Sequence, residues 1–191
     1  MITTKSDLRK YIIADRLALN RKRSNWIVNF IKRKLYWEKI LVEDYLLSLR
    51  KMEYLTNIKR NPIQKITYLF VLYRFRKRSF KTHINIPVNV VGPGLVIYHL
   101  GPITINAGAR IGKNCTLYSG VIIGQNKIPE NVPIIGDNVY FGPGSKAFGN
   151  IKIGNNVIVA PNSVVVKDVP DNCVVSGVPA RIIKRDGIKI I

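Results

Sequence analysis

The sequence of 191 residues contains few cysteines, few acidic residues and no long apolar segment. Its two cysteines, Cys115 and Cys173, are too few for a disulfide framework and show no CxxC spacing. We interpret them as small buried residues in a reducing compartment. The first residues mix charged and apolar side chains, unlike a signal peptide. The longest strongly apolar run, Ile66–Tyr73, has about eight residues, whereas a membrane-spanning helix needs about 20. These absences predict a cytoplasmic protein.

The positive charge of the chain is large and unevenly distributed. There are 31 Lys and Arg against 11 Asp and Glu, which gives a net charge of +20. Residues 1–82 contain 21 basic and 6 acidic residues, whereas residues 83–191 contain 10 and 5. Any electrostatic partner should therefore contact the N-terminal segment.

Residues 1–82 have the periodicity of helices. Apolar residues recur at spacings of three and four in segments near residues 8–15, 26–31, 38–52 and 63–80. Ser6–Asp7 could cap the first helix, and Asn61–Pro62 interrupts the pattern before the last one. We predict a basic α-helical subdomain of three or four helices over residues 1–82.

Residues 83–191 follow a period of six instead. With one interruption, every sixth position is apolar, at Ile105, Ile111, Leu117, Ile123, Ile135, Phe141, Ala147, Ile153, Val159 and Val165. The position four residues after nine of these ten is small or β-branched, at Ala109, Cys115, Val121, Val139, Ser145, Ile151, Val157, Ser163 and Val169. A fixed repeat of this kind indicates a solenoid.

Each group of six residues would form one flat side of a triangular coil, so that three groups close a turn. The large aliphatic residues would stack in the core. Glycine or asparagine would supply corners with positive φ, and Asn114, Asn138, Asn155 and Asn156 fit these corners. The interruption at residues 125–133 is polar and bounded by proline, and we expect a loop there that could carry binding groups.

Four stretches, at residues 92–112, 117–124, 134–154 and 174–183, resemble the hexapeptide-repeat acyltransferases. Within that family they are similar to the serine acetyltransferase-like branch, and the GVPA in the last stretch is specific for this group. The start of the chain (KSDLRKYIIADRLAL) also resembles the branch found in capsule and exopolysaccharide gene clusters. The resemblance implies a mainly β fold, a left-handed parallel β-helix preceded by the α-helical subdomain. It also implies a homotrimer with active sites between neighbouring coils.

The resemblance places the catalytic histidine at His99, in the segment IYHLG. A hydroxyl has too high a pKa to attack a thioester unaided at neutral pH, and a neutral imidazole can remove its proton during the attack. Acetyl-CoA would supply the activated acyl group, so the reaction requires no metal. A structural histidine at the edge of the coil is the alternative. We interpret His83, the other histidine, as structural or solvated.

The resemblance also implies a path for acetyl-CoA along the C-terminal coils. Gly142 and Pro143 would line the pantetheine path, and Pro161 would follow one coil later. Lys167, Arg181 and, as a weaker candidate, Lys184 could contact the nucleotide phosphates. Coil corners and solvated surface charges are the alternative interpretations of these residues.

The sequence departs from the serine acetyltransferases at residues that matter for the acceptor. Ile84 stands where those enzymes carry the acidic residue that orients the histidine, and we expect the neighbouring Asn85 to accept the Nδ1 proton of His99 instead. Tyr98 replaces an Asp, and Asn131–Val132 replaces an Arg-His pair. On these grounds we expect a saccharide acceptor in capsular or exopolysaccharide biosynthesis. Serine O-acetylation and a catalytically inactive trimeric scaffold are the alternatives.

Runs of basic residues in the N-terminal segment occur at Arg21–Arg23, Lys32–Lys34 and Arg74–Arg78. No nucleic-acid-binding motif accompanies them, so we expect no nucleic-acid partner. Attraction to the anionic inner membrane surface or to an acidic glycan is the better functional hypothesis, because each basic residue near such a surface contributes about 1 kcal/mol. Nearby aromatic residues could rest on lipid, although packing inside the subdomain is the more usual role.

Overall fold

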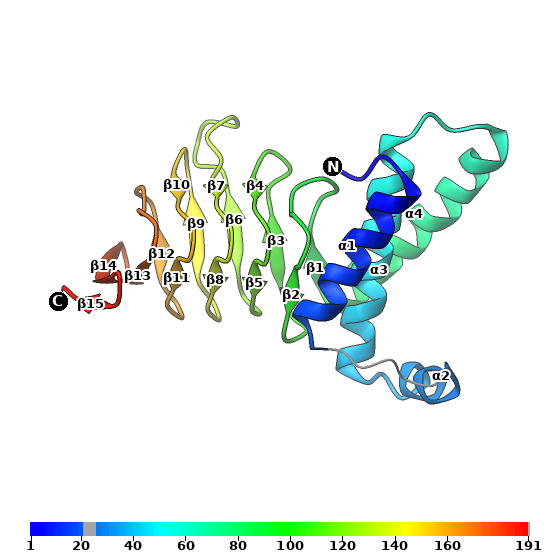
Figure 1. Ribbon diagram of the computed structural model, residues 1–191, viewed down its shortest axis with the longest axis horizontal. Helices are drawn as coiled ribbons and strands as arrows, with labels where there is room; N and C mark the ends of the chain where they lie inside the picture. The colour runs from blue at the N-terminus through cyan, green and yellow to red at the C-terminus, as the bar shows by residue number, and fades with distance from the viewer. Residues whose placement is uncertain (21–25, 191) are drawn as a thin grey trace.

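The computed structural model describes residues 1–20 and 26–190. The basic run Arg21–Arg23 therefore lies outside the described residues, and so does the side chain of Trp26. The described helices cluster at one end of an elongated molecule, and the coil of short strands extends from them to the C-terminus (Figure 1).

Four helices precede the coil: α1 (Lys5–Ala18), α2 (Trp26–Lys34), α3 (Glu38–Asn57) and α4 (Pro62–Thr82). The predicted cap of α1 was misplaced by two residues, because Thr4 is the N-cap and Asp7 completes a capping box with it. At α4, Asn61 and Gln64 form a second capping box, and Pro62 occupies the first turn, where its missing N–H has no cost.

The strands form the three flat sides of the coil. The first sheet contains β1 (Ile84–Asn85), β3 (Ile103–Ile105), β6 (Ile122–Gly124), β9 (Lys146–Phe148) and β12 (Val164–Val165). The second contains β4 (Arg110–Ile111), β7 (Ile134–Ile135) and β10 (Lys152–Ile153). The third contains β2 (Val96–Ile97), β5 (Thr116–Leu117), β8 (Tyr140–Phe141), β11 (Ile158–Val159), β13 (Cys173–Gly177), β14 (Ala180–Arg185) and β15 (Ile188–Lys189).

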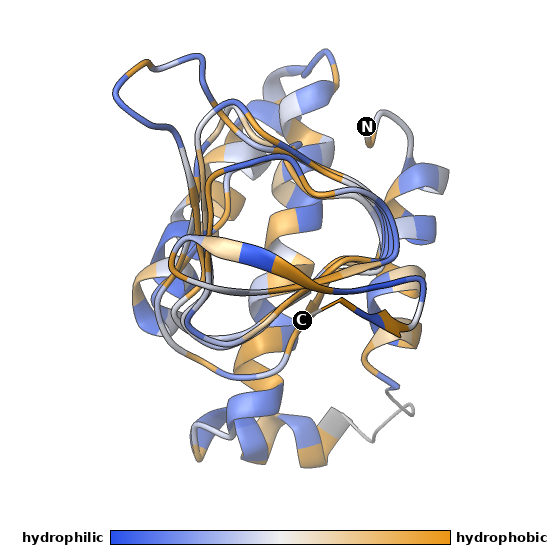
Figure 2. Cartoon of the chain, turned by 90° about the vertical axis from the view of Figure 1, so that its left-hand side faces the viewer, coloured by the Kyte–Doolittle hydropathy of each residue, from blue (hydrophilic) through white to orange (hydrophobic). Residues whose placement is uncertain are grey.

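The coil is a left-handed parallel β-helix, as the resemblance to the hexapeptide-repeat acyltransferases implied. Pairing is parallel from β1 to β13, and the antiparallel strands β14 and β15 end it. All ten residues of the period-six series are buried, and so are the nine residues that follow them by four positions. The view along the coil shows the triangular cross-section with apolar residues lining its sides (Figure 2). Stacking of the turns therefore buries one continuous apolar column.

Asparagines at the corners form a ladder along one edge. Asn114, Asn138 and Asn156 have positive φ, as predicted, and each donates from Nδ2 to the next asparagine of the ladder over 2.8–3.0 Å. Asn172 continues the series and donates to Asp186. Asn155 is a different case, because its φ is not positive and its Oδ1 accepts the backbone N–H of Asp137.

The helices and the coil share one core. Val42, Tyr45, Leu46 and Leu49 of α3 belong to the same buried cluster as the residues of the coil. The hydroxyl of Tyr45 also accepts the backbone N–H of Ile86 at the start of the coil. Helix α3 thus covers the first turn, which would otherwise expose its apolar end.

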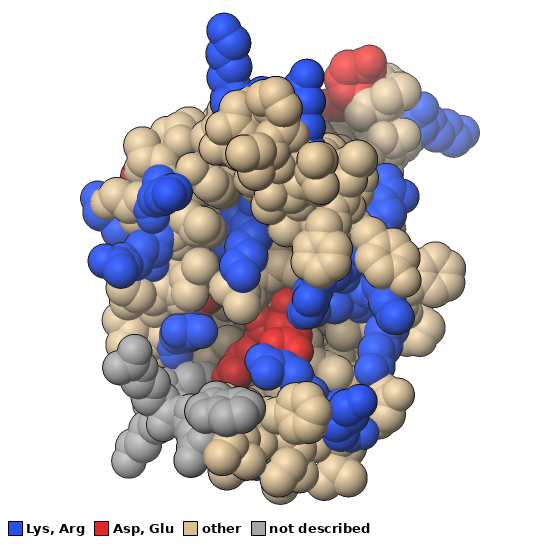
Figure 3. Space-filling model, turned by 90° about the vertical axis from the view of Figure 1, so that its right-hand side faces the viewer, with Lys and Arg blue, Asp and Glu red and all other residues tan. Residues whose placement is uncertain are grey.

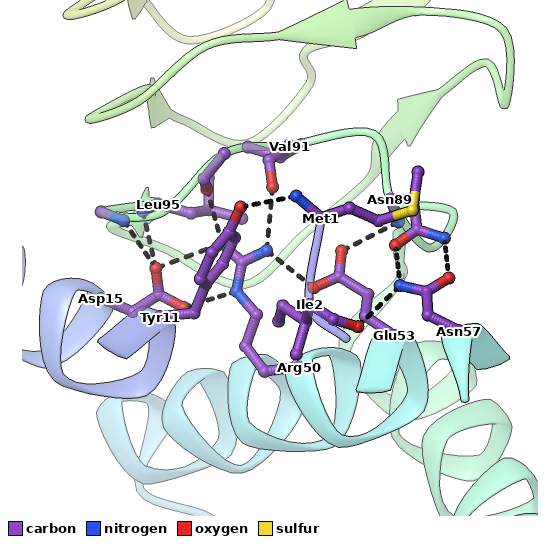
Figure 4. Close-up of polar contacts among 12 residues, drawn as sticks. Met1, Ile2, Tyr11, Asp15, Arg50, Glu53, Asn57, Asn89, Val91 and Leu95 are labelled. Atoms are coloured by element: carbon purple, nitrogen blue, oxygen red, sulfur yellow. Dashed lines mark hydrogen bonds and ion pairs between the residues drawn. The ribbon is translucent and has the colours of Figure 1, made fainter. Parts of the chain in front are cut away.

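A buried ion cluster joins α1, α3 and the first turn (Figure 4). The Arg50 side chain is fully buried and contacts Asp15 at 2.8 Å and Glu53 at 3.0 Å. It also donates to the carbonyls of Val91 and Gly92. Three backbone N–H groups of this turn donate to the two carboxylates. That of Asn89 donates to Glu53, and those of Gly94 and Leu95 donate to Asp15. The cluster fixes the segment that leads into β2.

Candidate active site

His99 lies at a corner of the coil, between β2 and β3. Gly101 donates its backbone N–H to the carbonyl of Thr82, and Ile103 donates to the carbonyl of His83. These bonds hold the corner against the C-terminal end of α4. The side chain of His99 is 62% exposed, so it can reach a substrate from the surface of the coil.

A carboxylate from α3 meets this histidine. Oε1 of Glu38 lies 3.4 Å from Nδ1 of His99 and accepts the backbone N–H of Leu100 at 2.6 Å. If Nδ1 of a neutral imidazole carries the proton, Nε2 presents its lone pair to the solvent side, which is the arrangement that a general base needs.

Asn85 does not take this position. It lies in β1, and it lines a hollow together with His83 and Phe80. The structure places Glu38 at Nδ1 of His99, where we had expected Asn85. The spacing of residues in the sequence does not indicate a contact between α3 and a corner of the coil. The sequence showed only that Glu38 lies in the first turn of a predicted helix.

Three tyrosines continue along the third sheet from His99. The rings of Tyr98 and Tyr118 stack with centroids 5.0 Å apart, and Tyr140 follows 5.4 Å from Tyr118. A hydrogen bond with Tyr140 raises the pKa of the Tyr118 phenol. The ring of His99 is 6.0 Å from that of Tyr118. The candidate site therefore has an aromatic wall on one side of the histidine.

Gly142, Pro143 and Pro161 lie on the same edge of the coil as His99. His99, Pro143 and Pro161 each stand two residues after a strand of the third sheet, namely β2, β8 and β11. A Cβ atom at Gly142 would lie 2.8 Å from the backbone N of Pro161, so only glycine fits this approach. The structure thus brings three of the predicted acetyl-CoA residues onto the edge that bears His99.

The basic residues that were predicted to contact the nucleotide phosphates lie at two different places on the coil. Arg181 and Lys184 are exposed on β14. Gly177, the last residue of β13, donates its backbone N–H to Oγ of Ser163, two residues after Pro161, at 3.1 Å. Lys167 instead follows β12 of the first sheet. The loop at residues 125–133 follows β6 of the same sheet, so Lys167 and the loop share an edge other than that of His99.

Metal ligands are not gathered at this site. Within residues 1–20 and 26–190, no group of three or more His, Cys, Asp and Glu side chains is placed to hold a metal ion. Over the same residues, no helix is both long and apolar enough to cross a membrane.

The coil and the site define a class of protein. The family model of the bacterial transferase hexapeptide (six repeats) matches residues 133–167. Together with the left-handed coil, this match confirms the resemblance to the hexapeptide-repeat acyltransferases that the sequence indicated.

Within this class the chain is similar to serine acetyltransferases. That of Staphylococcus aureus strain Mu50 is 40% identical over 114 residues, which are 58% of this chain and 54% of the relative. The crystal structure of the Neisseria gonorrhoeae enzyme in complex with serine has 27% identity and a TM-score of 0.66, and the match covers 94% of this chain and 70% of that one. A serine acetyltransferase solved in complex with CoA shares the fold, with 23% identity, a TM-score of 0.67 and coverage of 93% and 70%. The chain spans about half the length of the curated relatives it matches.

The expectation of a saccharide acceptor is wrong. The relatives and solved structures named above are serine acetyltransferases, and they give no support to a role in capsular or exopolysaccharide biosynthesis. Our expectation rested partly on Ile84, which replaces the acidic residue that orients the histidine. Because Glu38 brings a carboxylate to His99 from a helix, the loss at Ile84 is no argument against a serine acetyltransferase.

Proposed function

We propose that this chain catalyses the transfer of an acetyl group from acetyl-CoA to the hydroxyl of serine, with His99 as the general base. The observation that carries the proposal is the exposed imidazole of His99 with a carboxylate at its Nδ1, on the edge that also bears Gly142, Pro143 and Pro161. The similarity to serine acetyltransferases supports the choice of acceptor.

The reaction needs one proton carrier. Nε2 of His99 would take the proton of the serine hydroxyl while the oxygen attacks the thioester carbon of acetyl-CoA. The new C–O bond forms, the C–S bond breaks, and the thiolate of CoA leaves. The imidazolium then returns the proton to the sulfur, so that CoA and O-acetylserine are the products.

We propose a homotrimer as the active assembly. In one chain, His99 and the loop at residues 125–133 lie on different edges of the triangular coil. When three coils pack side by side, the loop of one chain can lie beside the His99 edge of the next. Lys167 would then approach acetyl-CoA from the neighbouring chain, whereas Arg181 and Lys184 would approach it from the same chain.

The test is the release of CoA thiol from acetyl-CoA by the wild type, by His99→Ala and by His83→Ala as the matched control. We expect release that depends on serine, that falls by about 10²–10⁴-fold in His99→Ala, and that persists in His83→Ala. Release with other hydroxyl compounds but not with serine would refute the acceptor. Full activity of His99→Ala would refute the base, and no release with any acceptor would favour an inactive scaffold.

We also propose that the helical end of the molecule contacts an anionic membrane surface. Helix α4 exposes an apolar row at Ile63, Ile66, Leu69, Phe70 and Tyr73. A hollow beside this row is lined by basic side chains of α2 and α4, those of Arg33, Arg74, Lys77, Arg78 and Lys81. Figure 3 shows Lys and Arg gathered on this end around a small acidic area.

The charge of this surface favours an anionic partner over a second copy of the chain. Burial lowers the pKa of Arg78, and the guanidinium groups of Arg74 and Arg33 lower it further, whereas Asp44 opposes them. Asp44 is itself paired with Arg33 at 2.7 Å. An anionic lipid surface neutralises such a cluster and accepts the apolar row of α4 as well.

Co-sedimentation with vesicles tests this proposal. We expect binding to vesicles of phosphatidylglycerol and phosphatidylcholine at low salt, and weaker binding by Arg74→Gln/Lys77→Gln. The control Lys113→Gln/Lys152→Gln removes the same charge from the coil and should bind as the wild type does. Equal binding to pure phosphatidylcholine vesicles, or no binding to anionic ones, would refute the proposal.

A further inference from the structure

We propose that Glu38 positions His99, so that helix α3 supplies a carboxylate to a histidine of the coil. The inference builds on the proposed role of His99 as the general base. It assigns to α3 a function in catalysis besides its packing against the first turn of the coil.

The start of α3 directs this carboxylate away from its own helix. Trp37 is the N-cap residue and makes no side-chain capping bond, and Glu38 is the first helical residue. The Glu38 side chain could serve the helix terminus, but it reaches the His99 corner instead. Its bond to the N–H of Leu100 holds the carboxylate in place whether or not His99 is protonated.

The contact has two chemical consequences. A proton on Nδ1 can be donated to the carboxylate, which selects the tautomer with a free lone pair on Nε2. When Nε2 takes the proton of the acceptor, the positive charge on the ring develops 3.4 Å from a negative one, which lowers the energy of that state. Glu38 receives no proton in this scheme, so it is a positioning residue.

Among the described groups near His99, Glu38 is the one that can accept a charge-assisted hydrogen bond from Nδ1. Tyr98 precedes the histidine and Tyr118 contacts its ring, but neither side chain carries a carboxylate. Over the described part of the chain, Glu38 is the acidic residue within ion-pair distance of His99. The pair is open to solvent, with 62% and 41% of the two side chains exposed, so its contribution to stability is small. A loss of function in Glu38→Gln, which keeps an acceptor for the N–H of Leu100, would therefore not reflect unfolding.

Nitrogen NMR of the histidine side chains tests the tautomer without any acceptor. The chain has only two histidines, and His83→Gln assigns the signals of His99. We expect neutral His99 to carry its proton on Nδ1 in the wild type, and to shift toward the Nε2-protonated form in Glu38→Ala. If wild-type His99 carries its proton on Nε2, or if Glu38→Ala leaves the tautomer unchanged, the inference is wrong.

Kinetics then test the catalytic consequence. Glu38→Gln retains an acceptor for Leu100 but loses the charge, and we expect kcat to fall by about tenfold or more with KM for acetyl-CoA unchanged. Glu38→Asp should recover part of the loss. The control Glu43→Gln removes the same charge on the same helix and should keep the wild-type kcat.

An unchanged kcat in Glu38→Gln would overturn the positioning role. Failure of the proposed function looks different. In that case no acceptor is acetylated by the wild type, while the NMR experiment still reports whether Glu38 selects the tautomer of His99.

Discussion

Replacing Arg50 with methionine should lower the free energy of unfolding more than a substitution of similar size at an exposed position does. Methionine keeps much of the length of the side chain but removes the charge and all its donors. The change leaves the buried carboxylates of Asp15 and Glu53 without a counter-charge, and the carbonyls of Val91 and Gly92 without their side-chain donor. Removing one partner of a buried ion pair typically costs about 3–5 kcal/mol. We expect a loss of this size in the free energy of unfolding.

Urea titration followed by circular dichroism at fixed protein concentration measures this loss. Lys51→Met is the matched control, because Lys51 is the next residue of α3 and is exposed. The double variant Arg50→Met/Glu53→Gln should recover part of the loss, because glutamine removes the unpaired charge and can still accept the N–H of Asn89. If Arg50→Met differs from Lys51→Met by less than about 1 kcal/mol, the cluster does not stabilise the fold as we argue.

The pH dependence of the stability lost in Arg50→Met distinguishes an effect of charge from an effect of packing. Burial raises the pKa of Glu53 above its ordinary value, and Arg50 opposes that rise. A group with a raised pKa in the folded state contributes stability below its unfolded pKa, and this contribution is lost as pH rises through the folded value. Without Arg50 the pKa of Glu53 rises further, so the deficit of Arg50→Met should be larger near pH 8 than near pH 5. A deficit independent of pH would indicate lost packing instead.

Two further predictions concern the coil. Asn156→Ala should destabilise the protein by about 2 kcal/mol, because alanine is strained at a positive φ and cannot bond to Asn138 and Asn172, whereas Asn156→Gly should lose only the side-chain bonds. Urea titration of both variants checks this, and equal losses would contradict the backbone argument. Burial raises the pKa of the Cys115 thiol to about 12, so we expect it to resist a thiol reagent near pH 8 until urea unfolds the chain. Rapid labelling of the folded protein at Cys115 would contradict that burial.

The coil and the main helices could be predicted from the order of the residues alone. A parallel β-helix repeats the same local environment in every turn, so each buried position reappears at a fixed spacing and can be read from Ile105 to Val165. Asparagine at a corner can also be predicted locally, because asparagine adopts a positive φ more readily than most other residues. For the same reason Asn155 and Asn156 could not be told apart by type alone, and the structure assigns the corner to Asn156.

The way in which the helices contact the coil could not be predicted and is known from the fold. Asp15 and Arg50 lie far apart in the sequence, and the fold buries their side chains together. The partner of His99 was likewise decided by the position of α3 over the first turn, which brings Glu38 to the histidine while Asn85 lies elsewhere. Periodicity reports which side of an element is buried, but it carries no information on which distant element covers that side. Contacts between two regions of different period therefore depend on packing in three dimensions.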